Sequence, residues 1–249
     1  MDYLVKVGTL DTERSDALIL PVLLDGKWTP SGQHLDKISD RYLSKILKTG
    51  DMTGKFKQTL LLHDVPGIKA KRVLLIGCGK ESELTEAKYQ ELVCLAINTL
   101  KQTAAQEVCC LLPELAYKKR TQIWNIRQAI ISAAATMYQF NDFRSKKNQA
   151  EKTLTGLTFL VDKAELAASK NAVNEGTAIS RAMDFAKNLE NMPANICNPK
   201  YIAATATKWA KSQKKVKCTV LGEKAMEKLG MGALLAVGRG SENESQLIV

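Results

Sequence analysis

The sequence predicts an α/β fold in which helices cover both faces of a sheet. Short, nearly continuous apolar runs, such as residues 16–22, are typical of strands that are buried on both faces. The segments between them are longer and carry apolar residues at helical spacing, as in 85–103 and 121–140. Strands and amphipathic helices that alternate in this way indicate one sheet between two helical layers.

The first 162 residues supply most of these elements. Strands are predicted at 3–7, 16–22, 59–63, 71–80, 107–112 and 157–161. Helices are predicted at 35–47, 85–103 and 121–140, the last with these residues facing inward: Ile123, Ile126, Ile130, Ala134 and Met137. The polar segment 141–155 between helix and strand is expected to be an exposed loop.

A long helix at 163–190 is expected to connect this domain to a second one. Its predicted inward stripe is Val173, Gly176, Ile179, Met183 and Ala186. The second domain is expected to contain a helix at 201–212, a strand at 216–221, a helix at 223–229, and strands at 233–237 and 246–249. Pro199 suits the first turn of a helix, and Gly230 suits a helix C-cap.

Composition excludes several classes of protein. An apolar fraction of 45% and a charged fraction of 25% over 249 residues are those of a globular protein of one or two domains. The sequence has no run of 18 apolar residues and no basic head followed by an apolar stretch, so neither a transmembrane helix nor a signal peptide is expected. Its six cysteines form no CxxC pair, which favours free thiols in a reducing cytoplasm.

The net charge of +10 is spread along the chain. Residues 1–160 contain 23 Lys and Arg against 17 Asp and Glu, and residues 161–249 contain 13 against 9. A solvated basic surface is the plainer interpretation, and DNA binding through phosphate contacts is the other. DNA would be bound by three basic clusters, which the order of elements could bring to one face. They are Lys69, Lys71 and Arg72; Lys118, Lys119 and Arg120; and Arg144, Lys146 and Lys147.

Two motifs in the last third of the chain carry a family resemblance. Asn188, Pro193 and the run 195–197 form an NxxxxPxNIC turn, and residues 229–241 read LGMGALLAVGRGS. In this order they resemble the start of the catalytic domain of the leucine aminopeptidase (cytosol aminopeptidase) family, two-metal enzymes that remove N-terminal residues from peptides. The resemblance implies a macro-domain-like α/β domain at 1–162, a connector helix at 163–190 and the start of the peptidase domain at 191–249.

That family resemblance also implies an activity and an assembly. The family's members are metal-dependent aminopeptidases, and the implied properties here are leucine-type preference in peptide turnover, a cytoplasmic location and a homohexamer. Two divalent ions, manganese or zinc, would activate a bridging water and polarise the scissile carbonyl.

The family's metal ligands lie in a K-G-x-x-F-D-[ST]-G-G segment and an N-T-D-A-E-G-R segment, and the sequence contains neither. No catalytic, cofactor-binding or metal-binding residue is therefore assigned. Four charged residues are available but match no ligand of the family: Asp184, Glu190, Lys224 and Lys228. We expect the 249-residue chain to bind no catalytic metal pair and to be inactive alone. The last strand, 246–249, is expected to be incompletely supported.

Other patterns are weaker. Gly77-x-Gly79 follows a strand and could seed a phosphate-binding turn, but position 82 is Ser82 where a third glycine would stand. Nearby acidic residues would also repel a phosphate, so a tight structural turn is favoured. Residues 238–241 are interpreted as a strand end and turn, and the asparagine-proline segment as a structural turn.

The two histidines, His34 and His63, are too few for a zinc site of the usual type. His63 could pair with the adjacent Asp64, and a Cys–His nucleophilic pair stays open. The alternative to a peptidase is a macro-like module that binds an ADP-ribose-type ligand, or a DNA-binding accessory protein. Coding sequence after Val249 would distinguish these hypotheses.

Overall fold

The computed structural model describes residues 1–145 and 154–249, which form two compact units, Met1–Met183 and Asp184–Val249. The boundary between the units falls inside the long helix α5 (Leu166–Asn191). The division into a domain at 1–162, a connector helix at 163–190 and a second domain at 191–249 stays a prediction. No helix in the described ranges is long and apolar enough to cross a membrane.

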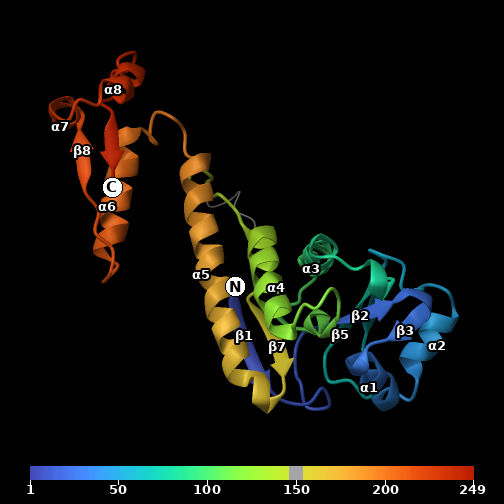
Figure 1. Ribbon diagram of the computed structural model, residues 1–249. Helices are drawn as coiled ribbons and strands as arrows, with labels where there is room; N and C mark the ends of the chain where they lie inside the picture. Colours follow the sequence, from blue (N-terminus) through green and yellow to red (C-terminus); the bar gives the residue numbers. More distant parts are fainter. Residues whose placement is uncertain (146–153) are drawn as a thin grey trace. The chain divides into compact units, whose positions relative to one another are not determined.

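The first unit is built on a seven-stranded sheet (Figure 1). Its strand order is β1-β7-β6-β2-β5-β4, with the short β3 paired to β2. Strands β1, β7, β6, β2 and β5 are parallel, whereas β3 and β4 run antiparallel to their neighbours. The strands are β1 (Asp2–Val7), β2 (Ala17–Leu23), β3 (Lys27–Trp28), β4 (Thr59–His63), β5 (Arg72–Gly79), β6 (Glu107–Cys110) and β7 (Gly156–Val161).

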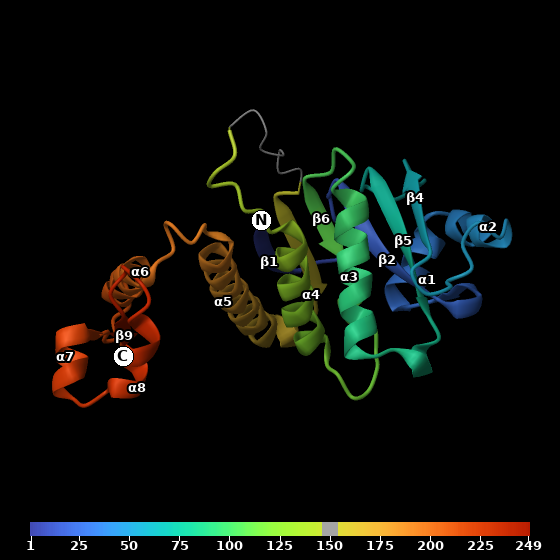
Figure 2. The ribbon, with the colours of Figure 1, turned by 90° about the horizontal axis from the view of Figure 1, so that it is seen from above.

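Helices cover both faces of this sheet (Figure 2). One face packs against α1 (Pro30–Ile38) and α2 (Tyr42–Lys48), and the other against α3 (Glu86–Leu100), α4 (Gln122–Met137) and the first part of α5. Alternate residues of β2 point into the two cores: Ile19 lies with the α3 and α4 layer, and Leu18 and Leu20 lie with the α1 and α2 layer. The predicted α/β fold and its strands in this unit are confirmed.

The segment predicted as one helix at 35–47 is two helices. Asp40 and Arg41 have φ angles of 49° and 57°, which interrupt the helix between α1 and α2. The Asp36 carboxylate then accepts hydrogen bonds from the Ser44 backbone N–H at 2.7 Å and from the Ser44 hydroxyl at 2.6 Å. These bonds fix the start of α2 against the end of α1, which the apolar spacing alone did not indicate.

The inward face of α5 also differs from the prediction. Ile179 and Met183 are 41% and 37% exposed, and Ala186 is exposed too. The buried positions are small residues: Ser169, Ala172, Gly176 and Ser180. A side chain at Gly176 would place its Cβ 3.1 Å from the Arg127 carbonyl oxygen, so the small face lets α5 approach α4 closely.

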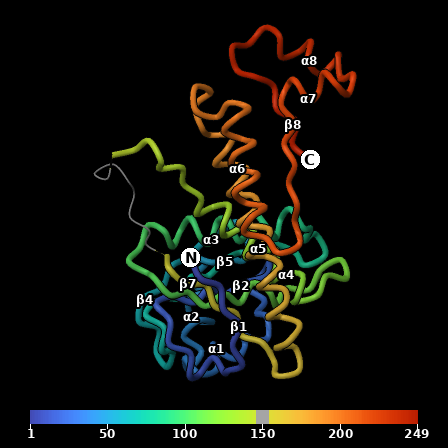
Figure 3. The backbone as a smooth tube through the Cα atoms, turned by 90° about the vertical axis from the view of Figure 1, so that its left-hand side faces the viewer, coloured from blue at the N-terminus to red at the C-terminus, as the bar shows by residue number. Residues whose placement is uncertain are grey.

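The second unit contains the end of α5 followed by five short elements, which Figure 3 traces from orange to red. They are α6 (Pro199–Lys211), β8 (Val220–Gly222), α7 (Glu223–Lys228), α8 (Gly232–Gly238) and β9 (Gln246–Ile248). Asn198 caps α6 by accepting from the Tyr201 N–H at 3.0 Å, and Pro199 occupies the first turn as predicted. Strands β8 and β9 pair antiparallel.

Two predictions in this unit are wrong. The run 233–237, predicted as a strand, lies in α8, so residues 238–241 contain the end of a helix and a turn instead of a strand end. The strand predicted at 216–221 begins only at Val220. A short apolar run does not distinguish strand from helix, and here Leu235 is buried while Val237 is 86% exposed, the one-sided burial of a helix. Gly230 has a φ of 72°, as a C-cap glycine requires.

Candidate functional site

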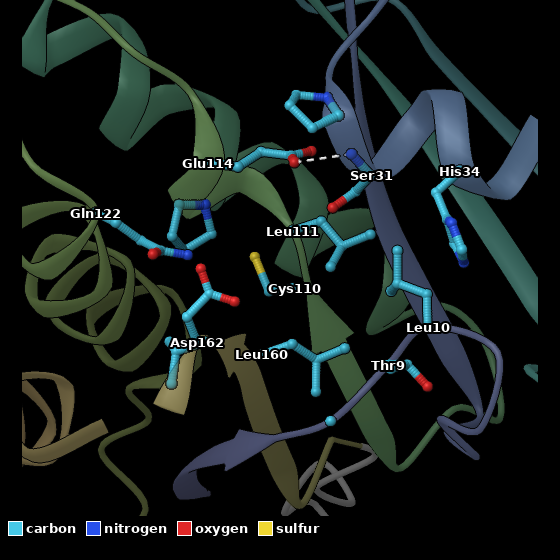
Figure 4. Close-up of a pocket in the computed structure, with 14 residues that line it drawn as sticks. Thr9, Leu10, Ser31, His34, Cys110, Leu111, Glu114, Gln122, Leu160 and Asp162 are labelled. Atoms are coloured by element: carbon cyan, nitrogen blue, oxygen red, sulfur yellow. Dashed lines mark hydrogen bonds between the residues drawn. The ribbon is translucent and has the colours of Figure 1, made fainter. Parts of the chain in front are cut away.

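A pocket of about 390 Å³ lies at the carboxyl ends of the parallel strands β1, β6 and β7, beside the first turn of α1 (Figure 4). The chain leaves β2 toward α1 on one face of the sheet and leaves β6 toward α4 on the other, so the connections diverge there. Ligands of open α/β sheets bind in such crevices. The lining residues are Gly8, Thr9, Leu10, Pro30, Ser31, His34, Cys110, Leu111, Pro113, Glu114, Gln122, Leu160, Val161 and Asp162.

Glu114 joins the two sides of this pocket. It lies on the 3₁₀ turn Leu112–Glu114 directly after β6. Its carboxylate accepts a hydrogen bond from the Thr29 hydroxyl at 2.5 Å and another from the Ser31 backbone N–H at 3.1 Å. Burial raises the pKa of Glu114, while these two hydrogen bonds act in the opposite direction. The carboxylate therefore caps the first turn of α1, some 85 residues earlier in the chain.

The buried amide of Asn125 in α4 holds the turn that carries Glu114. Its side-chain nitrogen donates to the Pro113 carbonyl at 3.0 Å and to the Leu115 carbonyl at 2.8 Å. Its side-chain oxygen accepts from the Tyr117 hydroxyl at 3.1 Å. Asn125 is fully buried, and every one of its side-chain polar atoms has a partner, so this turn is fixed by a satisfied network.

Asp162, Gln122 and Cys110 surround one part of the pocket. Figure 4 shows the Asp162 carboxylate and the Gln122 amide turned toward the same space as the Cys110 sulfur. Within the described part of the chain, neither the Asp162 nor the Gln122 side chain has a hydrogen bond or ion pair. Burial raises the pKa of Cys110 to about 12, so it is a neutral thiol near neutral pH.

The structure gives His34 and His63 different places. His34 lines the pocket, and its Nε2 lies 2.5 Å from the Asp11 carboxylate. In Figure 4 its ring lies at the side of the pocket opposite Cys110, whose buried thiol is not ionised, so this pair lacks the contact that a Cys–His nucleophile requires. His63 is exposed at the end of β4, and no hydrogen bond joins it to Asp64 within the described residues.

The Gly77-x-Gly79 segment has a structural role. The Gly77 N–H donates to the Gln58 carbonyl at 2.7 Å, and the Gly79 N–H donates to the Gly54 carbonyl at 2.8 Å. A Cβ at Gly77 would lie 2.0 Å from the Lys55 carbonyl oxygen, so the close backbone approach requires glycine. Both amides are already used by the protein, which leaves neither of them for a phosphate.

The basic clusters do not gather on one edge of the sheet. Residues 69–72 lead into the amino end of β5, whereas residues 118–120 connect β6 to α4 at the opposite, carboxyl edge. Lys71 and Arg120 are each held in an ion pair, with Asp16 and Glu86 respectively. The convergence of the basic clusters on one face of the protein stays a prediction. In the third cluster, Lys146 and Lys147 lie outside the described residues.

The remaining candidates form no metal site. Asp184 and Glu190 lie on α5, and Lys224 and Lys228 lie on α7. No group of three or more His, Cys, Asp or Glu that could hold a metal ion exists among residues 1–145 and 154–249. The asparagine-proline segment is a turn in which the N–H groups of Ile196 and Cys197 both donate to the Pro193 carbonyl at 2.9 Å.

Glu114, Gln122 and Asp162 were not predicted as site residues from the sequence. A usable signal was present, because Glu114 and Asp162 each follow closely on a predicted strand. Polar residues just after parallel strands gather at the carboxyl edge of a sheet. To place the two carboxylates in one pocket, one also has to know the strand order. In the structure β6 and β7 are neighbouring strands.

These features define a class of protein: an α/β domain with a pocket at the carboxyl edge of its sheet, followed by a second α/β unit. Comparison with family models is more specific. Residues 19–147 match the N-terminal domain of the cytosol aminopeptidase family, and residues 184–249 match the catalytic domain of the same family. The chain belongs to the cytosol aminopeptidase family.

Curated relatives agree over the whole chain. A probable cytosol aminopeptidase of Idiomarina loihiensis is 44% identical over 248 residues, which are 99% of this chain and 50% of that protein. The cytosol aminopeptidase of Vibrio cholerae is 43% identical over 250 residues, covering 100% of this chain and 50% of that protein. The chain thus spans about half the length of the curated relatives it matches.

Solved structures show the same fold. A tomato leucine aminopeptidase mutant superposes with a TM-score of 0.79 at 23% identity, covering 100% of this chain and 50% of that one. The bottromycin maturation enzyme BotP superposes with a TM-score of 0.72 at 18% identity, covering 94% of this chain and 45% of that one. At these identities the likeness concerns the fold alone.

Proposed function

We propose that the chain is part of a metal-dependent aminopeptidase that releases N-terminal residues from peptides, with a leucine-type preference, in peptide turnover. The observation that carries this proposal is the order of the two family matches, N-terminal domain at 19–147 and catalytic domain at 184–249. Because the chain spans about half of its curated relatives, the activity is proposed for the whole protein.

The cofactors proposed for that whole protein are two divalent ions, manganese or zinc. When bound, such a pair supplies an activated water and polarises the scissile carbonyl. A group of three or more metal-ligating side chains is lacking in the described ranges, so no hydrolytic step is assigned to a residue of this chain. We accordingly propose that the 249-residue chain alone binds no catalytic metal pair.

The test compares two proteins: the 249-residue chain and the product of the full reading frame. Each is assayed for hydrolysis of leucine amide with manganese or zinc, before and after treatment with a chelator. The full protein is expected to be active and to lose activity on chelation, whereas the shorter chain is expected to be inactive. Hydrolysis by the shorter chain, or a stoichiometric two-ion site in it by calorimetry, would contradict the assignment.

Peptides are the proposed substrates, and a cytoplasmic homohexamer is the proposed assembly. Sedimentation velocity of the full protein would test the assembly. Binding of DNA through the basic clusters, among them those at 69–72 and 118–120, stays a prediction. A gel shift at low salt with Lys118 and Lys119 replaced by alanine would test it, because phosphate contacts give binding that weakens steeply as salt rises.

A further inference from the structure

We propose that the pocket at the carboxyl ends of β1, β6 and β7 binds a small organic cation, namely a protonated primary amine on an apolar body. This inference concerns the first unit alone. It holds or fails independently of the proposed peptidase function, because the pocket is lined only by residues 8–162.

The walls of the pocket suit an apolar body. Leu10, Leu111, Leu160 and Val161 line it, together with the rings of two prolines. A volume of about 390 Å³ lies at the small end of the range of ligand pockets, roughly 300–1,000 Å³. These walls favour a compact aliphatic group over a large dinucleotide.

The described lining of the pocket includes two carboxylates, and its one imidazole, His34, is already paired with Asp11. Asp162 and Glu114 supply carboxylates, and none of the described residues that line the pocket is a Lys or an Arg. The side chains of Asp162 and Gln122 have no hydrogen-bonding partner within the described residues, and both are turned into the same space (Figure 4). An ammonium group has three N–H donors and no acceptor, so the Asp162 carboxylate complements it, and rotation of the Gln122 amide would add its carbonyl oxygen.

An anionic ligand meets no Lys or Arg side chain among the described residues that line the pocket. In related architectures, phosphates bind at helix N-termini, where backbone N–H groups are free. Here Pro30 has no N–H, and the Ser31 N–H already donates to Glu114 at 3.1 Å. The Glu114 carboxylate thus takes the place at the first turn of α1 where an anionic ligand would bind. An ADP-ribose-type ligand would meet two carboxylates there, so the structure favours a cation over that alternative.

The test uses three probes that share a branched aliphatic body: isoamylamine, isoamyl alcohol and isovalerate. Each is titrated by calorimetry into the 249-residue chain, and a nucleoside diphosphate serves as a fourth probe. The amine is expected to bind at one site. The alcohol is expected to bind about tenfold more weakly, since it lacks the charge-assisted hydrogen bond of the ammonium group. The acid and the diphosphate are expected not to bind.

A variant at the pocket gives the decisive comparison. Asp162→Asn keeps the size of the side chain and removes its charge, and Asp162 is exposed, so the fold should not change. We expect the affinity for isoamylamine to fall about tenfold. The matched control is Asp64→Asn, an exposed carboxylate in the β4–β5 turn at the opposite edge of the sheet, which should leave the affinity unchanged. Equal affinity in both variants, no binding of the amine, or preferred binding of the acid or diphosphate would each overturn the proposal.

Discussion

The Glu114 carboxylate accepts a hydrogen bond from the Ser31 backbone N–H at 3.1 Å, although 83 positions separate the two residues. A helix usually receives its cap from its own N-cap side chain. In α1 the N-cap residue Thr29 makes no such bond and instead donates its hydroxyl to the same carboxylate. The α1 layer on one face of the sheet is thereby tied to the end of β6, and the pocket forms where they meet.

Replacing Glu114 with alanine should therefore destabilise the protein. The substitution removes a helix cap, which costs about 1 kcal/mol, and leaves the buried Thr29 hydroxyl without its partner. We expect the free energy of unfolding in urea to fall by about 1–3 kcal/mol. Glu81→Ala, at an exposed carboxylate in a 3₁₀ turn, is the control and should change it by less than about 0.5 kcal/mol. Equal losses in the two variants would show that Glu114 does not act as a cap.

Asp16 should make stability depend on acid pH. The Lys71 ammonium donates a hydrogen bond to its carboxylate at 2.8 Å, and the N–H groups of Glu107 and Gln106 donate two more. The pKa of Asp16 is lowered from 3.8 to about 2, first by Lys71 and then by the backbone of Glu107. A carboxyl group with a lowered folded-state pKa adds stability above its unfolded pKa and loses it as the pH falls through the folded pKa.

Unfolding of the native protein and of Asp16→Asn should be compared between pH 3.8 and pH 2. Over this window the free energy of unfolding of the native protein should fall by about 1–2 kcal/mol more than that of the variant. This is less than the full pKa shift of Asp16 would give, because Lys71 is exposed and solvent screens its charge. Parallel pH profiles for the two proteins would contradict the role given to Asp16. Lys69→Ala, a nearby cation without an ion pair in the described residues, should leave the slope unchanged.

Most of the first unit could be predicted from the sequence because its strands are continuous apolar runs and its long helices keep strict spacing. Residues 17–23 are almost all buried between two layers, so every position had to be apolar. The break at Asp40 and Arg41 was not predictable in this way, because neither is a glycine that signals a positive φ. The run 233–237 was misassigned because its length suits either a strand or a short helix.

The pocket could not be predicted from the sequence for a different reason. Its polar residues are far apart along the chain and are joined only by the strand order, in which β1 lies beside β7 and β2 beside β6. Neither Glu114 nor Asp162 belongs to a recognisable motif. The glycines and histidines that do stand out in the sequence serve turns, as Gly77 does, or lie at the margin of the pocket, as His34 does.

The small face of α5 gives a prediction about packing. A Cβ at Gly176 would lie 3.1 Å from both the Arg127 carbonyl oxygen and the Ile130 Cβ, and a larger side chain has no room to extend. Gly176→Leu should therefore lower the free energy of unfolding by about 1–3 kcal/mol, although leucine is the better helix former. Ala178→Leu, at an exposed position of the same helix, is the control. A Gly176→Leu protein as stable as the control would show that α5 does not need its close approach to α4.

The network around Asn125 gives the last prediction. Replacing Asn125 with alanine removes two hydrogen bonds to the carbonyls of Pro113 and Leu115 and one to the Tyr117 hydroxyl, and it leaves these buried groups without their partner. Each unsatisfied buried group costs about 1–3 kcal/mol, so we expect a loss of at least about 3 kcal/mol in the free energy of unfolding.

Asn125→Asp separates the two halves of this network. Aspartate keeps an acceptor for Tyr117 but cannot donate to the carbonyls, and it places a charge at a fully buried site. It should therefore be no more stable than the alanine variant at neutral pH and should recover stability as the pH falls, because a buried carboxyl is favoured in its protonated, donating form. Asn174→Ala, at an exposed position of α5, is the control and should unfold like the native protein. A native-like Asn125→Ala protein would mean that the turn carrying Glu114 is held by its apolar contacts alone.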